Sequence, residues 1–127
     1  MQNTTPQASI ILATYQWPEA LALVLSALLT QTEKSFEVMI ADDGSDERTK
    51  ATIKAYQSRA FFPVKHFWQE NKGFRKSRIL NQAIAAAKGR VLIFLDGDCV
   101  PHKDFVAQHV ALADAKHYVA GRRVDLS

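Results

Sequence analysis

The feature that most constrains the fold of this chain is a regular alternation of two kinds of segment. Short runs rich in apolar and β-branched residues predict strands at 9–15, 36–41, 64–68, 91–95 and 118–124. The segments between them carry apolar residues at helical spacing and predict helices at 19–31, about 46–58, 75–87 and 101–113. Strands alternating with helices form right-handed crossovers, so the pattern predicts an α/β fold with a mostly parallel sheet covered on both faces.

Local signals set the expected boundaries of these elements. Pro18 suits the first turn of the first helix, Ser45 or Asp46 is expected to cap the second, and Gly89 ends the third. The run 91–95 is the most apolar, which favours a central strand buried on both faces. Trp17 and Trp68 are expected in the core.

Length and composition limit the protein to a few classes. A chain of 127 residues with 47% hydrophobic and 23% charged residues fits one soluble globular domain, here 9–127, after a disordered segment 1–8. The net charge of +3 comes from basic residues interleaved with acids, so nucleic acid is not an expected partner. The same charge suits an anionic small molecule or peripheral contact with an anionic membrane surface. The single cysteine, Cys99, favours a cytoplasmic protein.

Polar residues follow three of the predicted strands directly. They are Thr14-Tyr15, Asp42-Asp43 and Asp96-Gly97-Asp98. In open α/β sheets, ligands bind outside the carboxyl ends of the strands. We therefore expect these residues to converge on one edge of the sheet and to form a ligand site.

Asp96 and Asp98 are two carboxylates separated only by Gly97 at the end of a buried strand. Such neighbours repel each other, and a divalent cation relieves the repulsion. Hard carboxylate oxygens suit Mn²⁺ or Mg²⁺, which complete their shells with water and phosphate oxygens. The motif therefore predicts a metal site that holds a nucleotide diphosphate, although an acidic turn after a core strand is the plain alternative.

Other polar residues near these strand ends suit the remaining parts of a nucleotide. Asp42 and Asp43 offer acceptors for a base imino group or for ribose hydroxyls, and Tyr15 offers a ring for stacking. The stretch 71–78 opens a helix with several cations, of which Arg78 is the best candidate for pairing with phosphate. The lysines there equally suit a solvated face, and the histidines receive no role.

Taken together, these motifs resemble the family-2 glycosyltransferases of the GT-A fold. The resemblance runs from Ser9 to the end of the chain and rests on 9–15, Gln31-Thr32, 36–46, Asn71-x-Gly73, Ser77-Arg78 and 94–98. The stretch from Gly73 to Pro101 is similar to bacterial chondroitin-polymerase-like and surface-polysaccharide transferases.

The resemblance implies a role for each motif. Thr14-Tyr15 and Asp42-Asp43 would hold the nucleobase and ribose, usually of uridine. Asp96 and Asp98 would hold ribose and the metal-bound diphosphate, with Arg78 near the nucleotide. The implied reaction transfers a sugar, with inversion, to an acceptor hydroxyl on a carbohydrate or lipid-linked molecule.

The same resemblance places the catalytic base in an acceptor-binding half that comes well after the Asp-x-Asp strand. We therefore expect the chain to Ser127 to be an incomplete GT-A domain that lacks this base and is inactive alone. Asp104, Asp114 and Asp125 lie too near the motif to serve as the base. An uncovered apolar sheet edge or face in such a domain predicts self-association.

Two other functions fit parts of the sequence. A non-catalytic nucleotide-binding module would keep the same pocket without an acceptor half. A haloacid-dehalogenase-type phosphatase would use Asp96 as nucleophile and Asp98 as acid. The phosphatase interpretation is disfavoured because its Asp-x-Asp belongs to the first strand and it needs a lysine and further acids downstream.

Overall fold

The computed structural model describes residues 5–70 and 76–116 of the chain. Within these residues, strands and helices alternate as the sequence predicted. The strands are β1 (Ala8–Thr14), β2 (Phe36–Asp42), β3 (Val64–Trp68) and β4 (Val91–Asp96). The helices are α1 (Pro18–Leu28), α2 (Glu47–Arg59), α3 (Lys76–Ala86) and α4 (Phe105–Lys116). The expected fifth strand, 118–124, lies outside the described residues.

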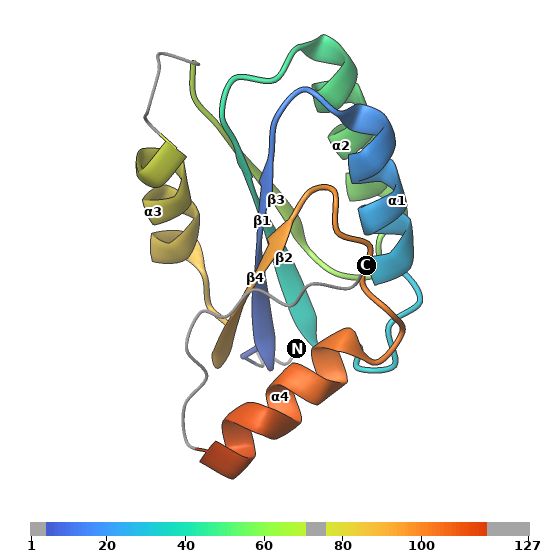
Figure 1. Cartoon of the computed structure of the whole chain (residues 1–127), viewed down its shortest axis with the longest axis vertical. Helices are drawn as coiled ribbons and strands as arrows, with labels where there is room; N and C mark the ends of the chain where they lie inside the picture. Colours follow the sequence, from blue (N-terminus) through green and yellow to red (C-terminus); the bar gives the residue numbers. More distant parts are fainter. Residues whose placement is uncertain (1–4, 71–75, 117–127) are drawn as a thin grey trace.

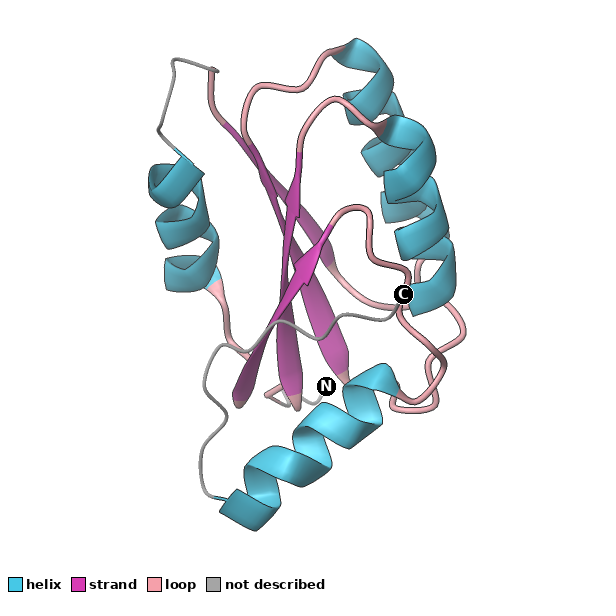
Figure 2. Cartoon of the chain, viewed as in Figure 1, coloured by secondary structure: helices cyan, strands magenta, loops and turns pink. Residues whose placement is uncertain are grey.

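The four strands form one parallel sheet in the order β3-β2-β1-β4. Helices α1 and α2 lie on one face of this sheet and α3 on the other (Figure 1). Figure 2 shows the strands running side by side between these two layers. The prediction of a mostly parallel α/β sheet covered on both faces is confirmed.

The strands alternate strictly between the two faces, as the two-residue repeat of a β-strand requires. Ile10, Leu12, Val38 and Ile40 belong to the larger core, which they share with α1, α2 and α4. The residues between them face α3 and belong to the smaller core, whose fully buried members are Ile11, Met39, Ala41, Ile79 and Ala83. This alternation decides later which strand-end side chains reach the candidate site.

The central position predicted for β4 is not seen among the described strands. Among the described strands, β4 pairs with β1 alone and forms an edge of the sheet. Leu92 and Phe94 face the smaller core and are only half-buried, whereas Ile93 and Leu95 are buried. The unbroken apolar run of β4 predicted that both faces of the strand are buried. In the described structure, one face is fully buried and the other is only half-buried.

Three helix boundaries can be compared with their sequence signals. Pro18 is the first residue of α1, as expected. Asp46 caps α2, because its side chain accepts hydrogen bonds from the backbone N–H groups of Arg48 and Thr49. The last helix begins at Phe105 rather than near Pro101, since residues 99–104 form an irregular segment.

The chain enters β1 in an extended path. Gln7 donates its backbone N–H to the Ser35 carbonyl, and Arg90 and Val91 donate theirs to the carbonyls of Pro6 and Gln7. Residues 1–4 of the segment expected to be disordered lie outside the described part of the chain. Among the described helices, none combines the length and the apolar character needed to span a bilayer.

Candidate functional site

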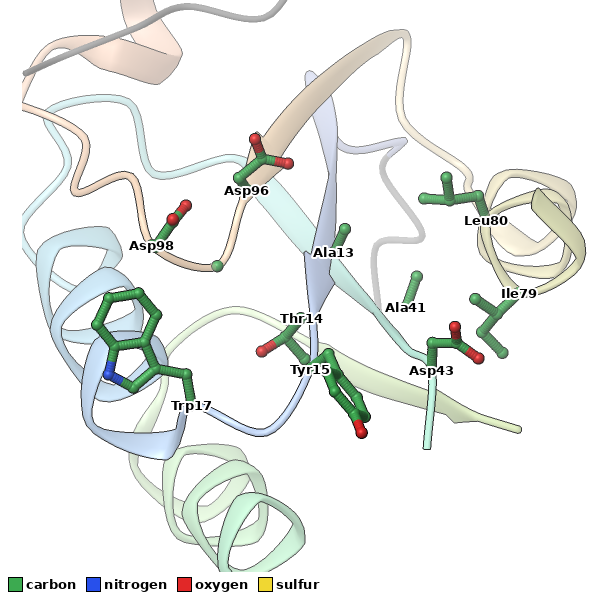
Figure 3. A pocket seen from close by; sticks show the side chains of 11 residues that line it. Ala13, Thr14, Tyr15, Trp17, Ala41, Asp43, Ile79, Leu80, Asp96 and Asp98 are labelled. Atoms are coloured by element: carbon green, nitrogen blue, oxygen red, sulfur yellow. The ribbon is translucent and has the colours of Figure 1, made fainter. Parts of the chain in front are cut away.

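A cavity of about 350 Å³ opens at the carboxyl ends of the strands, between the sheet and α3. This volume is in the range of small-molecule sites. Ala13 and Ala41 form its floor, and their small side chains leave room beneath Ile79 and Leu80 of α3. The remaining lining residues are Thr14, Tyr15, Trp17, Asp43, Asp96, Gly97 and Asp98 (Figure 3).

The cavity brings together most of the residues that the sequence singled out. Thr14, Tyr15, Asp43, Asp96, Gly97 and Asp98 all line it. They come from three separate strand ends, and the strand register accounts for their meeting, because Ala13 pairs with Asp96 and Thr14 pairs with Asp42. The predicted convergence on one edge of the sheet is therefore present, while Asp42 and Arg78 do not line the cavity.

Asp42 and Asp43 have different surroundings because adjacent residues of an extended chain point to opposite faces. The side chain of Asp42 is fully buried and accepts a hydrogen bond from the Ser45 N–H at 3.0 Å. Its other oxygen lies 2.9 Å from Nε2 of His66. Asp43 points into the cavity, and Gln69 donates to its Oδ1 at 2.9 Å. Asp42 thus shapes the loop, and Asp43 is the residue presented to a ligand.

Gly97 holds the acidic turn against β1. Its N–H donates to the Ala13 carbonyl at 2.7 Å. A Cβ at this position would lie 2.9 Å from that carbonyl oxygen and 3.0 Å from Oγ1 of Thr14, closer than side chains normally pack. Any larger residue would therefore push the turn, and with it Asp96 and Asp98, away from the strand end.

Asp96, Asp98 and Cys99 form a compact group of possible metal ligands. One ligand atom from each lies within 4.8 Å of the others. Asp96 is half-buried and Asp98 is exposed, so Asp98 is open to a ligand arriving from solvent. The carboxylate oxygens suit Mn²⁺ and Mg²⁺, whereas the soft thiol of Cys99 does not. The donor set therefore fits the predicted metal through its two carboxylates.

Tyr15 and Trp17 come from the loop between β1 and α1. Tyr15 is 50% exposed and Trp17 is 55% exposed, and both line the cavity. Trp68 is also exposed, so the expectation that both tryptophans lie in the core was wrong. Composition cannot separate a core tryptophan from one displayed at a site, but a position just after a strand end was an available signal.

The cationic stretch next to α3 is only partly described. Residues 71–75, which include Lys72 and Arg75, lie outside the described residues. Arg78 is exposed on the first turn of α3, directly before the lining residues Ile79 and Leu80. Its predicted contact with a nucleotide stays a prediction.

Gln31 is a supporting residue to which sequence reasoning gave no role. It is fully buried, and its Nε2 donates to the His102 carbonyl at 2.7 Å while its Oε1 accepts from the Val106 N–H at 3.0 Å. Thr32 adds a hydrogen bond from its N–H to the Lys103 carbonyl at 2.9 Å. These bonds anchor the segment that follows Asp98. The available sequence signal was a polar residue placed directly after an apolar helical stretch.

Comparison with known proteins gives a consistent match. The model of glycosyl transferase family 2 matches residues 9–126. The glycosyltransferase YfnE of Bacillus subtilis is 38% identical over 106 residues, which are 82% of this chain and 26% of that protein. The chondroitin synthase of Escherichia coli is 30% identical over 113 residues, 88% of this chain and 16% of the synthase. The chain spans less than half the length of these curated relatives.

Solved structures share the architecture. Residues 1–349 of S. aureus TarS in complex with UDP superpose with a TM-score of 0.74 at 26% identity, covering 95% of this chain and 38% of that one. The mannosyltransferase PcManGT of Pyrobaculum calidifontis, in complex with GDP-Man and Mn²⁺, has a TM-score of 0.66 at 20% identity and covers 77% of this chain and 29% of that one. The second likeness extends to the fold alone.

Proposed function

The chain belongs to glycosyltransferase family 2 and has the GT-A fold, and from this premise we propose that it binds a uridine diphosphate sugar together with Mn²⁺ or Mg²⁺. The protein then transfers the sugar, with inversion, to a hydroxyl group of a carbohydrate or lipid-linked acceptor. Products of this kind are polysaccharides, lipopolysaccharides and other glycoconjugates. The complex of TarS with UDP supports uridine as the nucleoside.

The observation that carries this proposal is the spatial order of the side chains that line one cavity. Asp43 lies beside Ile79 at one side, and Asp98 lies on the opposite side (Figure 3). The space between α3 and the small floor residues Ala13 and Ala41 suits a flat base, with the Asp43 carboxylate as acceptor for its imino group. Tyr15 borders the same space and offers its ring for stacking.

Asp96 and Asp98 are the residues that would hold the metal, and Asp96 also suits the ribose hydroxyls. When bound, the metal neutralises negative charge on the departing diphosphate. Asp98 contributes an exposed carboxylate, and Gly97 fixes its distance from β1 through the hydrogen bond to Ala13. Asp42 contributes indirectly by holding the loop that carries Asp43.

The reaction breaks the bond between the anomeric carbon and the diphosphate oxygen. An acceptor hydroxyl forms the new bond to the same carbon from the opposite face and loses its proton to a base. The carboxylates that line the cavity, those of Asp43, Asp96 and Asp98, are assigned to the donor. We therefore place the base in an acceptor-binding part of the protein, and we place the reaction in the cytoplasm or at the cytoplasmic face of the membrane.

Thermal unfolding in the presence of nucleotides tests the proposed donor. A ligand at 100 times its Kd stabilises the folded state by about 2.7 kcal/mol. With Mn²⁺ present, UDP should raise the Tm by several degrees and more than ADP does. Equal shifts for UDP and ADP, or none for either, would contradict uridine recognition.

Turnover separates the proposed enzyme from the two alternatives. The measurement requires a protein that includes the acceptor-binding part, because the base is placed there. In that protein, release of UDP from a UDP-sugar in the presence of acceptor supports the transferase, whereas tight UDP binding without release supports a non-catalytic nucleotide-binding module. The phosphatase interpretation is not supported, because the chain belongs to family 2 and its acidic motif follows the fourth strand. Hydrolysis of an aryl phosphate that is lost in Asp96→Asn would restore it.

A further inference from the structure

We propose that the indole ring of Trp17 is the platform on which the transferred sugar of the donor packs, an inference that rests on the proposed function. Trp17 lines the cavity with 55% of its surface exposed. Aromatic side chains commonly line small-molecule sites, where they offer a large apolar face and, in tryptophan, an N–H donor. Its position in the lining of the cavity, together with this exposure, makes the ring available to a ligand bound there.

The protein's other tryptophan shows the contrast. Trp68 is 42% exposed, but its Nε1 donates to the Ser45 carbonyl at 3.0 Å, and Nζ of Lys50 lies 4.3 Å from the centre of its ring. The N–H and the ring face of Trp68 thus both have partners within the protein. For Trp17, the described part of the chain provides no hydrogen bond to Nε1 and no aromatic or cationic neighbour for the ring. The exposed part of its face and its N–H are therefore available to a ligand.

The backbone around Trp17 is held firmly enough to position the ring. Gln16 has a φ of 52°, in the left-handed region that few residues other than glycine adopt. This conformation is secured by a hydrogen bond from the Gln16 N–H to Oγ of Ser45 at 2.8 Å and by another from the Asp46 N–H to Oε1 of Gln16 at 3.1 Å. Pro18, buried at the start of α1, fixes the other side. A ring on such a loop is ready to receive a ligand at a low entropic cost.

The order of groups along the cavity places the sugar beside this ring. A nucleotide sugar is a linear molecule in which the diphosphate separates the base from the sugar. With the base at the Asp43 side and the diphosphate near Asp98, the sugar continues past Asp98. Figure 3 shows Trp17 on the Asp98 side of the cavity, away from Asp43 and Ile79.

The chemistry of the two partners is complementary. A pyranose ring presents a face of C–H groups, which carry partial positive charge, and the face of an indole is negative. The indole N–H can in addition donate to a sugar hydroxyl. Trp17 would therefore contribute to the binding of the sugar and make no contribution to the binding of the nucleotide.

Binding measurements with and without the sugar moiety test this role. We would titrate the purified parent and Trp17→Ala with UDP, UDP-GlcNAc, UDP-glucose and UDP-galactose in the presence of Mn²⁺. We expect the variant to lose about tenfold or more in affinity for at least one UDP-sugar that the parent binds, while its Kd for UDP stays within about twofold. Trp17→Phe should recover part of the loss, because it keeps an aromatic face.

Fluorescence provides a direct signal from the ring. The chain has two tryptophans, so Trp68→Phe leaves Trp17 as the single indole emitter. Its emission should respond to the UDP-sugar that shows the effect and change much less with UDP alone.

Each other outcome overturns the inference in a recognisable way. Unchanged affinity for every UDP-sugar in Trp17→Ala means that the ring contacts no donor sugar. An equal loss for UDP and the UDP-sugars places the ring on the nucleotide instead. A fluorescence response to free methyl glucoside but to no UDP-sugar assigns the ring to the acceptor. If the parent fails to bind UDP with Mn²⁺, the result contradicts the proposed function itself, and with it the role of Trp17 that rests on it.

Discussion

The backbone N–H of Gly97 donates to the carbonyl oxygen of Ala13 at 2.7 Å and ties the acidic turn after β4 to the end of β1. The two residues lie far apart in the sequence, and the parallel pairing of β1 with β4 brings their strand ends together. This contact fixes where Asp96 and Asp98 stand relative to the floor of the cavity. The position of the metal site therefore depends on a glycine that contributes no side chain.

Replacing Gly97 with alanine should weaken ligand binding more than it weakens folding. The added Cβ would meet the Ala13 carbonyl oxygen at 2.9 Å and Oγ1 of Thr14 at 3.0 Å, so the turn must move. We expect the affinity for UDP in the presence of Mn²⁺ to fall by about tenfold or more. Calorimetry together with a thermal melt checks this, and a variant with the parent's affinity would show that the close contact does not position the site.

Asp42 and Asp43 offer a matched pair of variants with opposite expected effects. Asp42→Ala removes a buried carboxylate that holds the Ser45 N–H and His66, and should destabilise the fold by about 2–4 kcal/mol. Asp43→Ala removes a group at the cavity and should reduce UDP affinity with little change in stability. Urea unfolding and nucleotide titration of both variants separate these roles. The reverse pattern would place Asp42 rather than Asp43 on the nucleotide.

Gln31 should stabilise the segment between Asp98 and α4. The Gln31 side chain is fully buried, and its amide group donates a hydrogen bond to the His102 carbonyl and accepts one from the Val106 N–H. Gln31→Ala should therefore cost about 2–3 kcal/mol. Amide hydrogen exchange should become faster at residues 102–106, and Gln108→Ala, an exposed residue of α4, is the control. Unchanged exchange at 102–106 would show that other contacts hold this segment.

Sequence patterns predicted the parts of the fold that local physics determines. Short apolar, β-branched runs predicted the strands, and Pro18 and Asp46 marked the starts of α1 and α2. The parallel arrangement explained why Thr14 and Asp98 converge. The pairing of β4 with β1 was not predicted, because which strands become neighbours depends on long-range pairing that an apolar run does not encode.

The candidate site was predicted in outline, but its division of roles was not. The motif Asp42-Asp43 contains two identical side chains, and only the pleat of β2 tells which one is buried against His66 and which one faces the cavity. The anchoring by Gln31 depends on the segment after α1 meeting the start of α4 in space, which no local pattern shows. Likewise, the exposure of Trp17 follows from the turn at Gln16 rather than from composition.

The most direct test of metal-dependent nucleotide binding is calorimetry of UDP with Mn²⁺ or with EDTA, performed on the parent, Asp98→Asn and Asp104→Asn. Asp104 is a suitable control, because it follows the same turn, and an asparagine there can still accept the hydrogen bond from Oγ1 of Thr32. We expect Mn²⁺ to raise the UDP affinity of the parent and of Asp104→Asn by about tenfold or more, and to have no such effect on Asp98→Asn. An equal Mn²⁺-dependent gain in Asp98→Asn and the parent would contradict the assignment of the metal site.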